Sequence, residues 1–425
     1  VCLVWQHSMV AWLATLLSFL FIVGFSILPQ SSLPVAGVQA FYTLLISALS
    51  KITHSFFPKD STLETKPHKT NGLRIAVIPV LVTLVFVFLY SQSNPIFGNF
   101  ISKLNFNSIT AGWVFFTLGS GLLLTGIFFP EKSEVLQNFD PLHPDNLLRK
   151  KTSLHGRIVR ILGLKSEFQI GKLLFGLLNL LLLLVNVLDL VYLFVLKTLP
   201  EGVQEKEFLH QSVNSLIFSV LLAIAIILYF FRGNLNFFRR NELLKIFVYL
   251  WIFQNLGLVL ITCYKNTSYI ENFGLTHKRI GVYVYLLLTC IGLCVTFLKV
   301  YAVKSNWFLI RANFSLSYGV LLLASFFSWD EIITNYNYRH YQKPSHEWLI
   351  DYAISLSDRN LPQLHQMLAD NSLNLSATQR NAIFSKKQLF LEKQKILFLE
   401  KQKSLVWQSW NWSDTHILST LTQDK

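Results

Sequence analysis

The chain has 425 residues, of which 52% are hydrophobic and only 14% are charged, and its mean hydropathy is +0.44. A soluble domain cannot cover so much apolar surface, so this composition excludes an ordinary soluble protein and predicts that the bilayer is the solvent. The net charge of +14 would suit nucleic acid. Because the basic residues lie in short loops between apolar runs, we interpret them as contacts to anionic membrane lipids, with no nucleic-acid partner.

Apolar runs of about 20 residues, the length needed to cross a hydrocarbon core, occur at about nine places. They cover residues 4–28, 34–57, 73–92, 109–130, 172–197, 213–231, 244–263, 280–303 and 312–329. The predicted fold class is therefore all-α, a polytopic transmembrane helical bundle. Val1 already lies in an apolar run, so further residues are expected to precede it.

The basic residues also predict the orientation of the bundle. Every second loop is rich in Lys and Arg. The loops at 58–74, 131–172, 232–245 and 304–311 together contain 18 such residues. The loops between them, at 29–34, 91–108, 197–212 and 264–280, contain 6. Short loops rich in Lys and Arg stay on the cytoplasmic side. The N-terminus is therefore expected inside, and the residues after Trp329 outside.

The composition changes after residue 329, where polar residues replace the Leu and Phe runs. We predict two domains, a transmembrane bundle over residues 1–329 and an extracytoplasmic helical tail over residues 330–425. Within the tail, "SHEWLIDYAISLSDRNLPQLHQMLAD" predicts two short helices that break before Pro362, with Asp358 or Asn360 as the cap of the second.

A repeat of eight residues, "LFLEKQKILFLEKQK", follows in the tail. Phe384, Leu391, Phe398 and Leu405 share one helix face at a spacing of seven residues, with Lys and Gln opposite. This face either packs on the short helices before it or docks on a partner or on the outer leaflet. The Trp cluster in "WQSWNWSD" indicates that the tail folds back on the membrane interface or closes a small core of its own.

Three polar side chains interrupt the most apolar span, "LLNLLLLLVNVLDLVYLFVL". Asn179 and Asn186 are seven residues apart and therefore share a helix face, and Asp189 lies one turn after Asn186. A charge in the bilayer costs at least roughly 2.5 kcal/mol on insertion scales, so Asp189 needs a partner, a water-filled cavity or a proton. The stripe is expected to point into the bundle.

Possible partners of Asp189 lie in the outer loops and in the seventh span. Glu207 and His210 are three residues apart, and Glu271 and Arg279 follow in the next outer loop. Gln254 and Asn255 are both expected to lie near mid-membrane, where an amide bonds across to a neighbouring helix. The candidate binding cluster comprises Asn179, Asn186, Asp189, Glu207, His210, Asn255, Glu271 and Arg279. Structural hydrogen bonding, a ligand cavity and a metal site all remain open for these residues, and no cofactor is implied.

Several stretches, taken in order, resemble a family of bacterial integral membrane proteins known only as a domain of unknown function, of the 4153/4173 type. They include "LLNLLLLLVNVLDLVYL", "YLWIFQNLGLV", "YIENFGLTHKRIGVYVYLLL", "IITNYNYRH" and "WQSWNWSD". The resemblance runs from about residue 70 onward. Matching positions are Asp189, Pro200, Gly202, Glu207, His210, Gln254, Asn255, Tyr269, Glu271, Gly274, Leu275, Thr276, Arg279, Asn313, Tyr336, Asn337, Trp410 and Asn411. The family usually has Arg where this chain has His277.

This resemblance implies a multi-pass α fold in a bacterial cytoplasmic membrane, and it implies no activity. Phosphate-binding glycine loops, nucleophile elbows and zinc-protease motifs are absent from the sequence. We therefore favour a non-enzymatic envelope component that binds an envelope protein partner through its outer loops and tail. The alternatives are a transporter or lipid-handling protein with an outward cavity around Asp189, and a transferase or hydrolase that acts at the outer face.

Overall fold

A computed structural model describes residues 8–56, 83, 111–149, 164–196, 219–238, 241–340, 347–370, 375–403 and 412–423. The regular elements in these ranges are all helices, and their β-pairing is limited to an isolated bridge between Asn146 and Lys304. The predicted all-α class is confirmed. The chain forms two compact units, residues 18–142 and residues 1–17 with 143–425, and each is described by itself.

Five helices in the described residues are long and apolar enough to cross a membrane. They are α2 (Met9–Ile27), α9 (Leu164–Leu190) with the π-helix η2 (Val191–Leu196), α11 (Glu242–Phe273), α12 (His277–Tyr301) and α13 (Asn306–Ala324). Shorter apolar helices at Leu33–Ser47, Phe115–Phe128 and Ser219–Phe230 overlap three more predicted spans. The predicted span at 73–92 lies outside the described residues except for Thr83. The total of nine spans and their orientation therefore stay predictions.

The unit of residues 18–142 is held together by a polar row on one helix. Its later helices are α3 (Leu33–Phe56), α6 (Ala111–Phe128), α7 (Glu134–Gln137) and α8 (Phe139–Leu142). Gln39, Thr43 and Ser47 of α3 are one turn apart and fully buried. Gln39 and Thr43 donate to the Glu131 carbonyl, and Thr43 and Ser47 accept from its amide. These bonds satisfy the backbone that follows α6 and fix it on α3.

Glycines allow the helices of this unit to approach closely. A Cβ atom on Gly24 of α2 would lie 1.9 Å from the Ala36 carbonyl oxygen of α3, and one on Gly126 of α6 would lie 2.7 Å from Leu44 Cα. Small residues at such crossings favour helix association in lipid, where burial of apolar side chains supplies little driving force.

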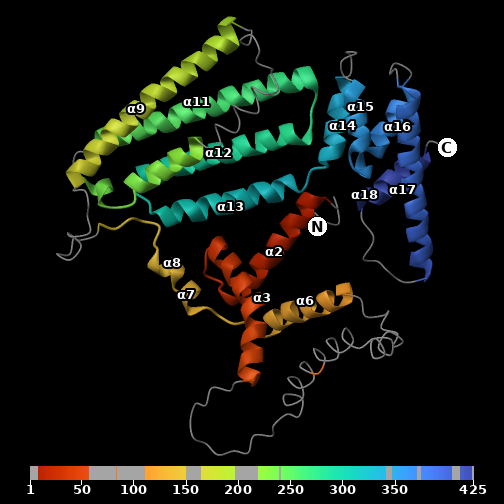
Figure 1. Ribbon diagram of the computed structural model, residues 1–425, viewed down its shortest axis with the longest axis horizontal. Helices are drawn as coiled ribbons and strands as arrows, with labels where there is room; N and C mark the ends of the chain where they lie inside the picture. Colours follow the sequence, from red (N-terminus) through yellow and green to blue (C-terminus); the bar gives the residue numbers. More distant parts are fainter. Residues whose placement is uncertain are drawn as a thin grey trace, which may run out of the picture. The chain divides into compact units, whose positions relative to one another are not determined.

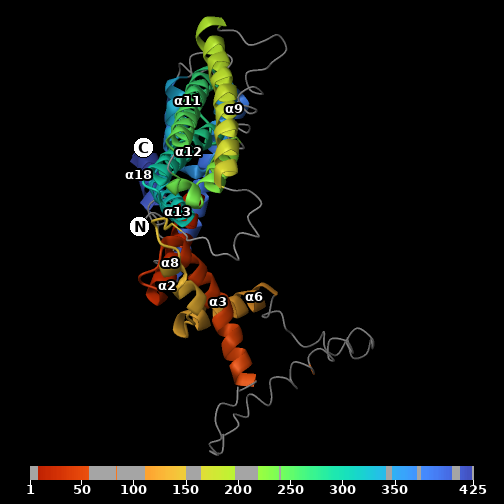
Figure 2. The same ribbon diagram turned by 90° about the vertical axis from the view of Figure 1, so that its left-hand side faces the viewer.

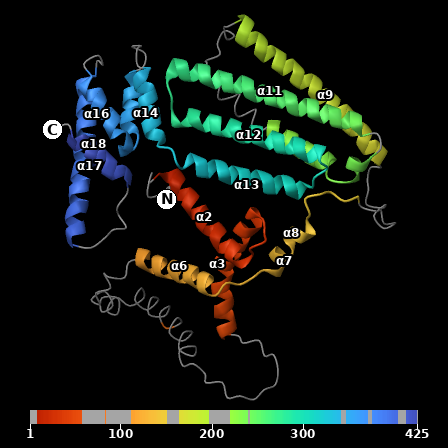
Figure 3. The ribbon, with the colours of Figure 1, turned by 180° about the vertical axis from the view of Figure 1, so that it is seen from behind.

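In the other unit, α9, α11, α12 and α13 run side by side (Figure 1), as the views from the side and from behind also show (Figures 2 and 3). Phe175 of α9 is fully buried and meets the rings of Phe230 and Trp251 edge to face, with centroids 5.7 and 5.3 Å apart. Aromatic pairs of this geometry contribute about 0.5–1.5 kcal/mol beyond their buried area. This core aligns α9 with α11.

Two helices differ from the apolar runs that predicted them. Helix α11 extends ten residues beyond the predicted end at 263, because Lys265 and Asn266 find partners on neighbouring helices and stay buried. Helix α13 begins six residues before the predicted start at 312. The Ser305 hydroxyl caps α13 by accepting from the Phe308 amide, and Arg311 in its second turn pairs with Asp145. The hydropathy pattern assigned the polar residues at the end of α11 and at the start of α13 to loops, because these residues are not apolar.

The tail consists of five α-helices and a short 3-10 helix. They are α14 (Trp329–Arg339), α15 (Glu347–Ser355), η5 (Asp358–Asn360), α16 (Leu361–Ala369), α17 (Ala377–Lys403) and α18 (Trp412–Gln423). The predicted pair of short helices is found as α15 and α16, with Pro362 in the first turn of α16. Helix α13 ends at Ala324 and α14 starts at Trp329, but both belong to the same compact unit. The domain boundary at 329 stays a prediction.

The centre of the tail is the fully buried side chain of Asn360. Its amide nitrogen donates to Thr334 Oγ1 of α14 and to the Ala353 carbonyl of α15, and its oxygen accepts from Lys386 of α17. Asn360 does occupy the N-cap position of α16, as predicted, but its side chain does not cap the helix. Instead, one satisfied amide joins three helices, which specifies their packing.

Helix α17 packs through a different face from the predicted one. Phe384 is 63% exposed, whereas the preceding Ile383 and the later Phe390 are 1% and 3% exposed. Both rows, 383/390 and 384/391, are apolar at a spacing of seven residues, so the pattern could not decide between them. Of the two alternatives, packing of the Phe384 face on the short helices was wrong for Phe384. The apolar clusters that α15, α16 and α18 form with α17 contain Ile383 and Phe390 of the adjacent row.

Candidate functional site

The polar stripe on α9 faces α11, as the sequence predicted. Asn179 is buried and donates to the Phe247 carbonyl of α11, while its oxygen accepts from Gln254 at 2.9 Å. Two helical turns after Asn179, Asn186 donates to the Gln254 carbonyl at 3.2 Å. The amides therefore form cross-helix hydrogen bonds, each worth about 0.6 kcal/mol on average in a membrane protein.

Asp189 completes the stripe with an ion pair that the sequence analysis missed. Lys265 Nζ of α11 lies 2.9 Å from Asp189 Oδ1, and the two side chains are 7% and 20% exposed. Asp189 also lies two residues before Val191, the first residue of the π-helix η2, a type of helix that often marks functional positions. A carboxylate that is largely buried in an apolar bundle is stable as an ion only when it is paired. Lys265 is therefore the partner that allows an acidic residue in this apolar span.

Some acceptors in the same region lack partners. Asn186 Oδ1 and Gln254 Oε1 are buried and accept no hydrogen bond from the residues that the structure describes. Both belong to side chains whose nitrogen atoms are used between α9 and α11. Unsatisfied buried acceptors are rare in proteins and usually indicate a bound water, ion or ligand.

The other members of the predicted cluster lie elsewhere or cannot be placed. Of the two amides expected to bond across to a neighbouring helix, Gln254 does so by donating to Asn179 of α9. Asn255 is buried and donates to the Trp251 carbonyl of its own helix. Glu271 is exposed near the end of α11. Glu207 and His210 lie outside the described residues.

Arg279 closes the turn between α11 and α12. Its guanidinium donates to the carbonyl oxygens of Phe273 and Gly274 and lies 4.5 Å above the centre of the Tyr269 ring. A cation at the C-terminus of a helix is favourable because the last carbonyls carry partial negative charge. The hydrogen bonds of Arg279 therefore stabilise the turn, and Lys265 is the cation that pairs with Asp189.

Asn337, a side chain of the tail, forms two hydrogen bonds with the backbone of this turn. Asn337 of α14 accepts from the Leu275 amide at 2.6 Å and donates to the Leu275 carbonyl at 2.9 Å. Gly274 has a φ of +75°, and a Cβ atom there would lie 2.6 Å from Leu349 Cδ2 and 2.9 Å from Asn337 Oδ1. Only glycine adopts this conformation without cost and leaves room for both side chains.

We call the two hydrogen bonds between Asn337 and Leu275 the clamp, and an ion pair between His277 and Asp330 lies beside it. His277 Nε2 lies 2.6 Å from Asp330 Oδ1 of α14, and the Ser357 hydroxyl and amide both donate to Asp330 Oδ2. Burial raises the pKa of the Asp330 carboxyl, but the hydrogen bonds from His277 and Ser357 outweigh it and lower that pKa to about 2. Asp330 is therefore ionised at neutral pH, and it ties α12 to the tail.

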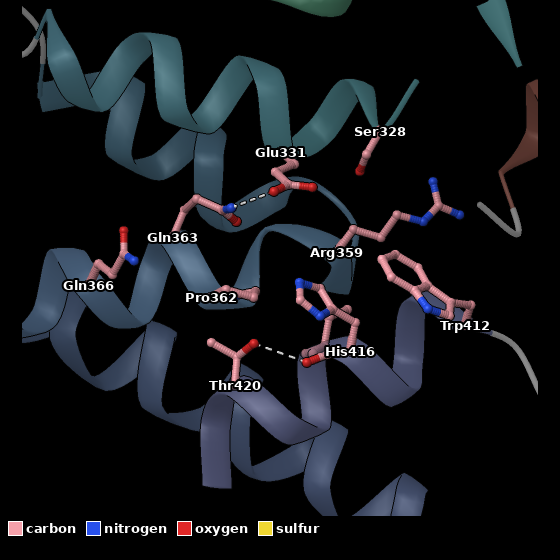
Figure 4. Close-up of a pocket in the computed structure, with 10 residues that line it drawn as sticks. Ser328, Glu331, Arg359, Pro362, Gln363, Gln366, Trp412, His416 and Thr420 are labelled. Carbon is pink, nitrogen blue, oxygen red and sulfur yellow. Dashed lines mark hydrogen bonds between the residues drawn. The ribbon is translucent and has the colours of Figure 1, made fainter. Parts of the chain in front are cut away.

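The tail also contains a pocket of about 310 Å³ (Figure 4). Helix α14, the segment from η5 to α16, and α18 form its walls. The residues that line it are Ser328, Glu331, Arg359, Pro362, Gln363, Gln366, Trp412, His416, Ile417 and Thr420. The Trp cluster that includes Trp412 stands out in the sequence, but no sequence pattern indicates that these segments meet.

The arrangement offers binding groups rather than a recognisable catalytic set. In the described residues, His, Cys, Asp and Glu side chains do not gather in groups that could hold a metal ion. The cysteines at 263, 290 and 294 are free thiols. The helices and the docked tail define the class of this protein, a polytopic helical membrane protein with a helical module fixed to one interhelical turn.

The chain belongs to the family described as Domain of unknown function (DUF4153), whose model matches residues 1–367. The match covers about 70 residues more at the N-terminal end than the sequence resemblance does, and it ends within α16. Trp410, Asn411 and the α18 wall of the pocket therefore lie beyond it. Neither a curated protein nor a solved structure matches the chain.

Proposed function

We propose that this protein is a non-enzymatic component of a bacterial cell envelope. In this proposal the membrane helices, in the cytoplasmic membrane, carry the tail on the outer side as a binding module for another envelope component. The single observation that supports it best is the clamp of Asn337 on Leu275. A tail held by backbone recognition keeps one orientation relative to α11 and α12, as a binding module near the membrane requires.

The tail carries features that suit binding. Phe384 and Leu389 of α17 are 63% and 67% exposed, and large exposed apolar side chains are common at interaction surfaces. The pocket lined by Trp412 is another feature of the tail that suits binding. The basic loops at 58–74 and 131–172 support the proposed orientation.

Photo-crosslinking in intact cells tests this function. Benzoylphenylalanine placed at 384, 389 or 412 is expected to yield a defined covalent adduct with an envelope component, whereas the same group at the buried position Phe390 is not. A cysteine at Thr378 should react with an impermeant thiol reagent from outside. Absence of adducts from all three exposed positions, or thiol labelling only after permeabilisation, contradicts the proposal.

A second candidate is a transporter or lipid-handling protein with a cavity around Asp189. The unpartnered oxygens of Asn186 and Gln254 beside the Asp189–Lys265 pair favour it. In that case a cysteine at residue 186 should react with a small, water-soluble thiol reagent, and Asp189→Asn should change the rate of labelling. An unreactive cysteine at 186 in the folded protein would exclude a water-filled path.

A further inference from the structure

The pocket in the tail has an exposed aromatic floor. Trp412 and His416 are one turn apart on α18, and their rings stack with centroids 5.0 Å apart and planes 8° from parallel. Trp412 remains 42% exposed. A tryptophan that stacks on a neighbouring ring and stays exposed to solvent presents its π face to a ligand. Such a face attracts the C–H groups on one side of a sugar ring.

The opposite walls carry planar polar groups (Figure 4). Glu331 Oε1 accepts from Gln363 Nε2 at 3.0 Å, which fixes the two side chains against each other. Gln363 Oε1 is buried and accepts no hydrogen bond from a described residue. Carboxylates and amides match pairs of adjacent hydroxyl groups, because each group offers two positions for hydrogen bonds. Hydroxyl groups of Ser328 and Thr420 add to this lining.

Arg359 supplies unused donors. Its side chain is half-buried and makes no hydrogen bond or ion pair with the residues that the structure describes. A guanidinium has five N–H donors and loses them at a cost when it is desolvated without acceptors. Arg359 is the donor-rich group of the pocket, and a ligand with several oxygen atoms would satisfy it.

The charges near the pocket select a neutral ligand rather than an anion. Glu331 lines the pocket. Burial lowers the pKa of the Arg359 guanidinium, and the nearby carboxylate of Asp414 acts in the opposite direction. Glu331 and Asp414 would repel a phosphate or a carboxylate. The volume of 310 Å³ lies at the small end of ligand pockets, about 300 to 1,000 Å³, which suits one or two sugar rings.

We infer that this pocket binds a neutral saccharide of one or two pyranose rings, stacked on Trp412 and hydrogen-bonded to Arg359 and the Glu331–Gln363 pair. The inference rests on the proposed function, since it names the chemistry that the tail would recognise. Failure of the inference and failure of the proposed function can be distinguished, because a protein partner can bind elsewhere on the tail.

Saturation-transfer NMR on the full chain in nanodiscs tests the inference. The probes are glucose, galactose, mannose, N-acetylglucosamine and their common disaccharides, with inorganic phosphate and succinate as anionic competitors. At least one saccharide is expected to bind with millimolar or tighter affinity. Trp412→Ala and Arg359→Ala should each weaken it about tenfold, the effect of losing one stacking or multi-donor contact.

Matched variants make the outcome specific. Trp113→Ala removes an exposed tryptophan in the other unit, Arg339→Ala removes an exposed arginine of α14, and both should bind normally. Gln366→Trp fills the pocket from an exposed position and should abolish binding without disturbing the core. Failure of every saccharide to bind, displacement by phosphate or succinate, or normal binding by Gln366→Trp overturns the inference. Envelope crosslinks that persist in that case would leave the proposed function standing.

Discussion

Lys265 on α11 neutralises Asp189 on α9 through a 2.9 Å hydrogen bond between side chains that are 7% and 20% exposed. The two residues are 76 positions apart in the sequence. Because each charge is stable in the apolar bundle only with the other, this contact holds α9 and α11 together.

Replacing one residue of this pair should destabilise the protein more than replacing both residues together. Asp189→Leu or Lys265→Leu alone leaves a charge without its counterion and should destabilise the protein by about 3 kcal/mol. The double variant should be less destabilised than the sum of the single ones. Thermal unfolding in detergent measures all three, with Lys278→Leu, an exposed residue of α12, as the control. Additive effects would show that the two side chains act independently.

The clamp on Leu275 predicts a local effect of Asn337→Ala. The variant leaves a buried amide and a buried carbonyl without partners, and each loss costs about 1–3 kcal/mol. Amide hydrogen exchange of residues 274–276 should accelerate, and proteases should release the tail more readily. Asn335→Ala on the same helix is the matched control. Equal exchange in both variants would mean that the tail is held by other contacts.

Gly274 should tolerate no side chain. Gly274→Ala places a Cβ 2.6 Å from Leu349 and forces an L-residue to a positive φ, so a loss of about 2 kcal/mol or more is expected from the backbone and the contact together. A Cβ on Gly281 in α12 meets nothing within 4 Å, and Gly281→Ala should be neutral or stabilising by up to about 1 kcal/mol. Melting temperatures of the two variants give the comparison. A harmless Gly274→Ala would contradict the described geometry of the turn.

Asp330 predicts an acid-sensitive tail. The pKa of its carboxyl is about 2 in the folded protein, below the ordinary value of 3.8. A depressed folded pKa contributes stability above the unfolded value and loses it as the pH falls, here between about pH 5 and pH 2. The contribution is about 2 kcal/mol at neutral pH. His277 of α12, Arg359 of η5 and Lys386 of α17 all face this carboxylate.

Unfolding of the tail followed from pH 6 to pH 2 by tryptophan fluorescence measures this contribution. Asp330→Asn should be less stable than the natural protein at pH 6 and should lose less stability on acidification. Asp351→Asn, an exposed carboxylate of α15, should retain the natural pH dependence. Identical acid profiles for the natural protein and Asp330→Asn would remove Asp330 from this role.

Lys386 joins α17 to the rest of the tail. Its ammonium donates to the carbonyl oxygens of Ile354, Leu356 and Ser357 and to Asn360 Oδ1, at 2.7–3.2 Å. Burial lowers the pKa of this ammonium, although Asp358 and Asp330 oppose the shift. Lys386→Met should therefore destabilise the tail by about 3 kcal/mol through lost charge-assisted hydrogen bonds. Lys393→Met on the exposed face of α17 is the control, and chemical unfolding provides the measurement.

Local properties of the sequence predicted much of this fold. Apolar runs long enough for a bilayer predicted helices in each described span, because hydropathy over 20 residues depends on composition and not on neighbours. The seven-residue spacing of Asn179 and Asn186 predicted a stripe that faces another helix, since helix geometry alone places both on one side. Pro362 likewise marked the break between α15 and α16.

The partners of these residues could not be predicted in the same way. Lys265 looked like a loop residue because its charge ended the apolar run, and only the packing of α9 on α11 shows that it is buried. The two apolar rows of α17 are equivalent in sequence, and contact with α15, α16 and α18 chooses Ile383 and Phe390.

The sequence by itself determined an all-helical membrane protein with polar residues turned inward, because bilayer thickness and helix periodicity act on each segment separately. Tertiary structure decided that Lys265 neutralises Asp189, that Asn337 holds Leu275, and that Arg359 shares a pocket with Trp412. Each of these pairs joins helices far apart in the chain, so their contacts depend on how whole helices pack.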